Sequence, residues 1–126
     1  MLEGKLSFYE HSINNAWTKM IQVIGIHAAT VAAHRAKYLT YMKYEEAHLI
    51  KIEKTGVSFD LLAQMFGSSR TEQITEEFLL SLVSIITRLL GPEETRVIFN
   101  DTYNNDIHKK ICITLQVSKM IMGTGE

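Results

Sequence analysis

One segment of the sequence, from about Arg70 to Leu90, has the length and composition of a helix that is apolar on nearly every side. Its central part reads Phe78-Leu79-Leu80-Ser81-Leu82-Val83-Ser84-Ile85-Ile86. An ordinary surface helix has one apolar stripe and one polar face. Because this segment has almost no polar face, we expect other elements to surround it, either from the same chain or from a second copy.

The rest of the chain predicts further helices and a short β element. A single proline, Pro92, leaves most of the sequence free to be helical, whereas 49–58 carries β-type apolar residues around Lys54-Thr55-Gly56. We therefore predict a mainly α fold, in which 1–126 forms one helical-bundle domain around a central apolar helix at about 70–90. A small β element is expected at about 49–58.

The segment 110–118 fits two structures. Its apolar residues alternate with polar ones, which is typical of a strand. Ile107, Ile111, Leu115 and Met122 also fall on one face of a helix. We favour a strand beside the 49–53 segment and keep the helix as the alternative.

Several residues predict where the helices begin and end. Ser7 and Ser69 each open a capping-box pattern with a glutamate three residues later, so helices are expected to start there. Gly25 either bends or breaks the first long helix or simply allows close packing, and Gly67 should end a short helix. Pro92 suits the first position of a further helix, with two glutamates following it.

Composition limits the classes of function. The chain has 126 residues with a formal net charge of −1 and a single cysteine, Cys112. Mixed charges give no electrostatic case for nucleic acid or anionic lipid, so nucleic acid is not an expected partner. The apolar run 78–90 is shorter than the roughly 20 residues that a membrane span needs, so no membrane partner is expected. We expect a cytoplasmic protein, because paired cysteines and a leader pattern are both missing.

Small residues form a stripe along one predicted helix, at Gly25, Ala29, Ala32 and Ala36. A stripe without bulky side chains lets another backbone approach closely. We favour an internal helix crossing for this stripe, and the alternative is an interface between two copies in a homodimer.

Two pairs of residues are candidates for binding chemistry. His27 and His34 share a helix face and could anchor a cofactor, but two helical turns separate them by about 10.5 Å. A single metal ion with bonds of about 2 Å could not take both. His108 and Cys112, four residues apart, are the alternative for a metal site. No further ligand lies at suitable spacing beside His27 or His34, and one histidine with one cysteine is a weak signal even with Asp101 and Asp106 nearby, so we predict no metal and no cofactor.

No catalytic constellation emerges from the sequence. Phosphate-binding glycine loops are absent, and the adjacent glutamate pairs diverge by about 100° on a helix. Cys112 has only His108 as a local base and no oxyanion loop. An enzymatic role is therefore not favoured.

Residues 61–77 resemble a helix-turn-helix, with Ala63 and Gly67 at the expected spacing and a candidate recognition helix after them. Two features depart from that pattern. Ser68 stands where an apolar residue is expected after the glycine, and the start of the second helix carries three glutamates against Arg70. Such acids would repel phosphates.

Three functional hypotheses follow. The first is a non-enzymatic interaction or regulatory module that forms a homodimer or docks a protein partner. The second is a sensor for a small apolar ligand or haem, anchored by His27 or His34. The third is DNA binding through 61–77.

Overall fold

The computed structural model describes residues 4–99, with side chains described from Leu6 onward, and its elements are mainly helical. In chain order they are α1 (Gly4–Tyr41), the 3-10 helix η1 (Glu45–Leu49), β1 (Lys51–Glu53), β2 (Gly56–Ser58), α2 (Asp60–Leu90) and α3 (Pro92–Ile98). Helices account for 84% of the described residues, which confirms the mainly α class. The candidate strand at 110–118 lies outside the described residues.

Glycines divide the two long helices at single residues. Gly25 in α1 has φ 85° and ψ 163°, and Gly67 in α2 has φ 80° and ψ 168°. Gly91, between α2 and α3, has nearly the same conformation at φ 89° and ψ 165°. This region of backbone conformation is open almost only to glycine. The predicted bend at Gly25 and the predicted end of a short helix at Gly67 are both confirmed.

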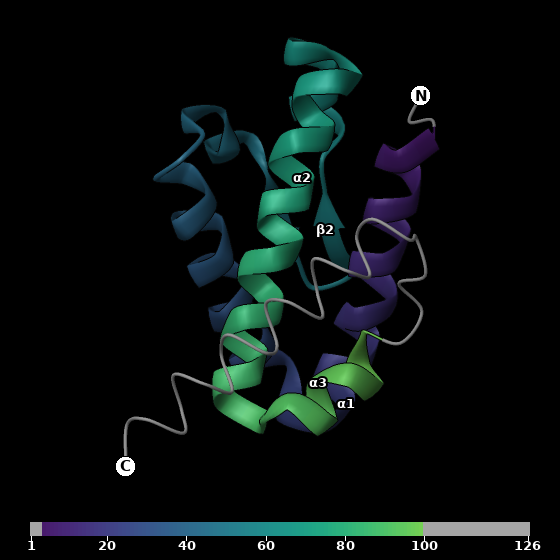
Figure 1. Cartoon of the computed structure of the whole chain (residues 1–126), viewed down its shortest axis with the longest axis vertical. Coiled ribbons are helices and arrows are strands. Elements are labelled where there is room, and N and C mark those ends of the chain that lie inside the picture. Colours follow the sequence, from purple (N-terminus) through teal and green to yellow (C-terminus); the bar gives the residue numbers. More distant parts are fainter. Residues whose placement is uncertain (1–3, 100–126) are drawn as a thin grey trace.

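The break at Gly25 folds α1 into a V of two arms, a first arm at 4–24 and a second arm at 26–41 (Figure 1). The helix α2 runs between these arms. The Tyr9 hydroxyl of the first arm donates to Glu76 at 3.0 Å, and Lys43, just after the second arm, lies 3.4 Å from Glu77. Neighbouring residues of α2 therefore face opposite arms of the V.

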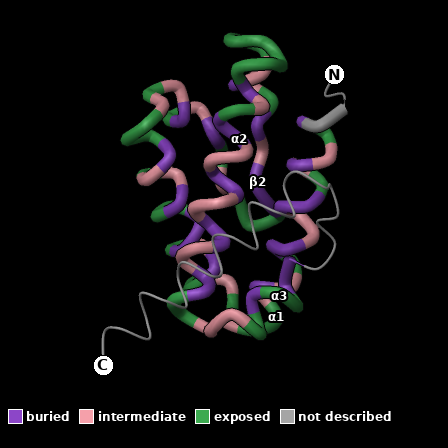
Figure 2. Tube along the Cα trace, viewed as in Figure 1, coloured by how far each residue is buried: buried purple, intermediate pink, exposed green. Residues whose placement is uncertain are grey.

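The central apolar helix is covered by its own chain. Its inner side is fully buried from Ile74 to Ile86 and meets both arms (Figure 2). The second arm contributes the small residues Ala29, Ala32, Ala33 and Ala36, all buried in the core. The first arm contributes larger side chains, among them Trp17 and Met20. Small residues on one arm and bulky residues on the other fill the two unequal gaps beside α2.

The predicted small β element is present, and it forms a hairpin. β1 pairs antiparallel with β2, with Ile52 opposite Val57 and Glu53 opposite Gly56. Phe59 follows the hairpin into the core, where its ring packs edge-on against Phe78 at 5.7 Å between centroids. This contact ties the hairpin to the central helix.

Two predicted helix starts are wrong. The first helix begins at Gly4, so Ser7 lies inside it. The long arm of α2 resumes directly after Gly67, so Ser69 lies in its first turn. There the Thr71 hydroxyl donates to the Gly67 carbonyl at 2.7 Å.

Candidate functional site

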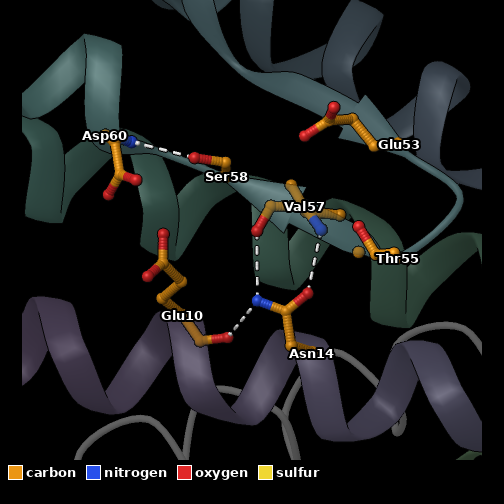
Figure 3. A pocket seen from close by; sticks show the side chains of 8 residues that line it. Glu10, Asn14, Glu53, Thr55, Val57, Ser58 and Asp60 are labelled. Carbon is orange, nitrogen blue, oxygen red and sulfur yellow. Dashed lines mark hydrogen bonds between the residues drawn. The ribbon is translucent and has the colours of Figure 1, made fainter.

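A hydrogen-bonded polar cluster lies where the first arm of α1 contacts the hairpin (Figure 3). The side-chain amide of Asn14 donates to the Val57 carbonyl at 3.0 Å, and its oxygen accepts from the Val57 amide at 2.8 Å. The same amide group also donates to the Glu10 carbonyl at 3.0 Å. Asn14 thus replaces the strand partner that β2 lacks on this edge.

Two neighbouring side chains extend this clamp along the first arm. The Trp17 indole donates to the Lys54 carbonyl at 3.0 Å in the hairpin turn. One carboxylate oxygen of Glu10 accepts from the Phe59 amide at 3.1 Å. The three side chains lie about one helical turn apart, which matches the path of an extended segment laid along a helix.

Glycine is required at the turn end of β2 because Asn14 lies against it. A Cβ atom built on Gly56 would fall 2.1 Å from the Asn14 side-chain oxygen. Gly56 also has φ 145°, which side-chain-bearing residues rarely adopt. The close approach of backbone to amide explains why this turn has a glycine.

The clamp borders a cleft of about 260 Å³ that carries three carboxylates, from Glu10, Glu53 and Asp60. Burial raises the pKa of Glu10 above its usual value, the Phe59 amide partly offsets this, and the Asp60 charge adds to the rise. Glu53 lies across the hairpin from Glu10, so the carboxylates do not converge (Figure 3). Within residues 4–99, no three His, Cys, Asp or Glu side chains form a group that could hold a metal ion.

A second candidate site is the outward face of the second arm. This face presents large apolar side chains between basic ones, and consists of Val31, His34, Arg35, Tyr38, Tyr41 and Met42. The exposed fractions are 69% for Val31, 52% for Tyr38, 42% for Tyr41 and 66% for Met42. Aromatic residues, methionine and arginine are the types enriched in protein interfaces.

The arm that carries the outward face contains no acidic residue. The sequence contains no Asp or Glu from residue 11 to residue 44, whereas Arg35, Lys37 and Lys43 lie close together in it. A shallow hollow of about 270 Å³ beside this face is lined by His34, Lys37, Tyr38, Tyr41 and His48. An anionic or aromatic group could be held there by imidazole and ammonium donors.

The residues of the predicted small-residue stripe do not share one environment. Ala29, Ala32 and Ala36 are buried inside the chain, while Gly25 is exposed at the tip of the V. In this structure the three alanines serve the internal helix crossing. A contact between two copies would therefore need other residues of this helix.

The histidine candidates do not form a common site. His27 and His34 are both exposed, and only His34 borders a hollow. The alanines of the same arm, Ala29, Ala32, Ala33 and Ala36, are buried in the hydrophobic core. His108 and Cys112, the candidates for a metal site, lie outside the described residues.

The helix-turn-helix candidate contains the Gly67 break at the expected place, but its cation is engaged within the chain. Arg70 donates to Glu46 at 2.6 Å, and its guanidinium lies 4.9 Å from the centre of the Tyr44 ring. The exposed arginine keeps its charge, since this pairing raises its pKa and lowers that of Glu46. The carboxylate of Glu46 nevertheless neutralises the region that would face DNA phosphates.

Sequence reasoning missed the hairpin clamp and the outward face. A polar residue on a helix gives no sign that it will meet a strand 43 residues away, so Asn14 could not have been found. The outward face did leave a signal, since the acid-free stretch 11–44 is visible in the sequence.

Among the described helices, none combines the length and the apolar composition that crossing a membrane would demand. Comparison of the chain with models of protein families, with characterised proteins and with solved structures finds no significant match.

Proposed function

We propose that this protein is a non-enzymatic docking module, and that the outward face of the second arm binds an acidic protein partner. The observation that carries this proposal is the combination of exposed Val31, Tyr38 and Met42 with basic side chains, on an arm that contains no Asp or Glu. Large exposed apolar side chains gathered on one face mark sites of interaction.

The charge of the face argues for a partner rather than a second copy. A two-fold symmetric dimer across this face would bring the basic side chains of both copies, Arg35 among them, into one interface to which this arm contributes no carboxylate. Like charges at an interface oppose association, whereas an acidic partner would gain both steering and complementarity. Homodimerisation therefore becomes the competing outcome in the test.

The first experiment selects displayed peptides against the full chain at low ionic strength. We expect the enriched peptides to combine Asp or Glu with Leu or aromatic residues, and their affinity to fall as salt is raised. Val31→Glu and Met42→Glu should each weaken binding by about tenfold or more, since each places a charge where apolar surface is buried.

Met65 supplies a matched control. It is 62% exposed on α2, close to the 66% of Met42, but lies outside the outward face. Met65→Glu should leave peptide affinity unchanged. Selection of no acidic apolar peptides, equal binding by Met42→Glu and Met65→Glu, or a wild-type dimer that Met42→Glu dissociates would each overturn the proposal.

A further inference from the structure

A second hollow, which shares Arg35 with the outward face, lies between the second arm of α1 and the last turns of α2. Its volume is about 450 Å³, within the usual range of small-molecule sites. It is lined by Arg35, Leu39, Ser84, Ile85, Arg88 and Leu89. On each helix, the lining residues recur four positions apart, so one stripe of the arm faces one stripe of α2.

The floor of the hollow is apolar, and the described residues leave part of it exposed. Leu89 is 58% exposed, while Leu39 and Ile85 are half-buried. Ser84, which is half-buried, places a short side chain among these apolar lining residues. Because these apolar atoms face water, the binding of an apolar group that covers them is favourable in free energy.

Two guanidinium groups belong to the same hollow. Arg35 lies 5.8 Å from the centre of the Tyr38 ring, and Arg88 lies in the last turn of α2, where the helix dipole favours a cation. Neither arginine forms an ion pair with another residue of the described part of the chain. The other two arginines there, Arg70 and Arg96, are both paired with glutamates.

From this combination we infer that the hollow binds a small amphiphilic carboxylate. The apolar body of the ligand would lie on Leu39, Ile85 and Leu89, and its carboxylate would accept hydrogen bonds from the guanidinium groups. Arginine matches a carboxylate with two parallel N–H donors. The site takes a molecule with one anionic end and a short apolar body, since 450 Å³ limits its length.

Decanoate, decanol and decylamine, each below its aggregation concentration, form a matched set of probes for calorimetry on the full chain. We expect decanoate to bind with one-to-one stoichiometry, decanol at least about tenfold more weakly, and decylamine more weakly still. A hydrogen-bonded charge contributes enough free energy for such a ratio.

Variants then locate the site. Arg88→Gln should weaken decanoate binding by about tenfold while leaving decanol unchanged, and Ser84→Phe should weaken both by filling the hollow. Arg96→Gln, which removes an exposed and paired arginine, is the control and should bind like the wild type. Circular dichroism would verify that each variant is folded.

Equal affinity for decanoate and decanol, or unchanged decanoate binding in Arg88→Gln, would overturn the inference. This result would leave the peptide-docking proposal intact, because Ser84 and Arg88 are not part of the outward face. Conversely, failure of peptide selection would not affect the carboxylate titration.

Discussion

At the scale of single residues, the buried threonine hydroxyl groups of α2 differ in whether they have a hydrogen-bond partner. Thr71 and Thr87 each donate to the backbone carbonyl four residues earlier, at 2.7 Å in both cases. Thr75 is equally buried, but its hydroxyl has no hydrogen-bond partner in the described structure. An unsatisfied buried hydroxyl is costly, because water solvates it in the unfolded chain.

Thr75→Val should therefore raise the free energy of unfolding by about 1 kcal/mol, since valine keeps the shape and removes the unpaired hydroxyl. Thr87→Val is the matched control on the same helix and should lower this free energy by about 1 kcal/mol. Urea unfolding monitored by circular dichroism measures both. Equal destabilisation by the two changes would contradict the assignment of Thr75.

Glu10 makes stability depend on pH in a direction opposite to that of a salt-bridged acid. Burial raises its pKa in the folded state, so the folded chain holds the proton more tightly than the unfolded chain does. The free energy of unfolding should therefore fall as pH rises from the ordinary value of 4.5 through the raised folded value.

Glu10→Gln should remove this contribution, because the amide oxygen can still accept from the Phe59 amide without carrying charge. We expect a shallower decline of stability over that pH window, measured by urea unfolding at a series of pH values. Glu53→Gln, in the same cleft, reports the effect of removing one negative charge there. A Glu10→Gln profile parallel to that of the wild type would count against the role of Glu10.

At the scale of elements, three glycines with almost identical backbone conformations set the path of the helices. Gly25, Gly67 and Gly91 each end one helix and start the next with no intervening loop. The residues after two of them share a second feature, since Thr71 and Thr95 each donate to the glycine carbonyl four residues earlier. A single glycine thus makes a compact corner between two helices when a threonine four residues later donates to its carbonyl.

Gly67→Ala should lower the free energy of unfolding by about 1–3 kcal/mol, which is the cost of placing a Cβ-bearing residue in this conformation. Nothing lies within 4 Å of the added Cβ, so the cost would come from the backbone alone. Ser68→Ala, at the next and exposed position, is the control and should change stability by less than about 0.5 kcal/mol. Unchanged stability in Gly67→Ala would show that the corner can relax.

Element boundaries show what the sequence can and cannot predict. Glycine and proline act through their own backbone, so the breaks at Gly25 and Gly67 and the start at Pro92 were predictable. The capping-box pattern at Ser69 is a less specific signal than a glycine. The helix already resumes after Gly67, two residues before Ser69. Asn14 illustrates contacts that no local pattern contains, since its partner Val57 is brought close only by the folded chain.

At the scale of the whole molecule, the fold distributes charge and apolar surface unevenly. The acidic cleft borders the first arm and the hairpin, whereas the outward face and its flanking hollows are lined by basic, aromatic and apolar residues. The apolar helix predicted at about 70–90 was recognisable from its composition. The elements that cover this helix could not be recognised from the sequence, because both arms lie against it only once α1 is folded into a V.

This arrangement predicts that residues 4–99 unfold as one unit. Both arms of α1 contact α2, and α1 also contacts the hairpin and α3, so every described element packs against at least one of the two long helices. The only tryptophan, Trp17, is buried on the first arm and bonded to the hairpin turn, so its fluorescence reports on that end of the structure. Circular dichroism reports mainly on the helices.

The midpoints of urea unfolding measured by the two signals should coincide, as expected for a small two-state domain. Phe59→Ala would test the connection, because Phe59 joins the hairpin to Phe78 of α2. It should lower both midpoints together, by the equivalent of about 3–5 kcal/mol. A fluorescence midpoint that moves while the helical signal stays in place would mean that the hairpin and first arm unfold independently, and the V would then be two units rather than one.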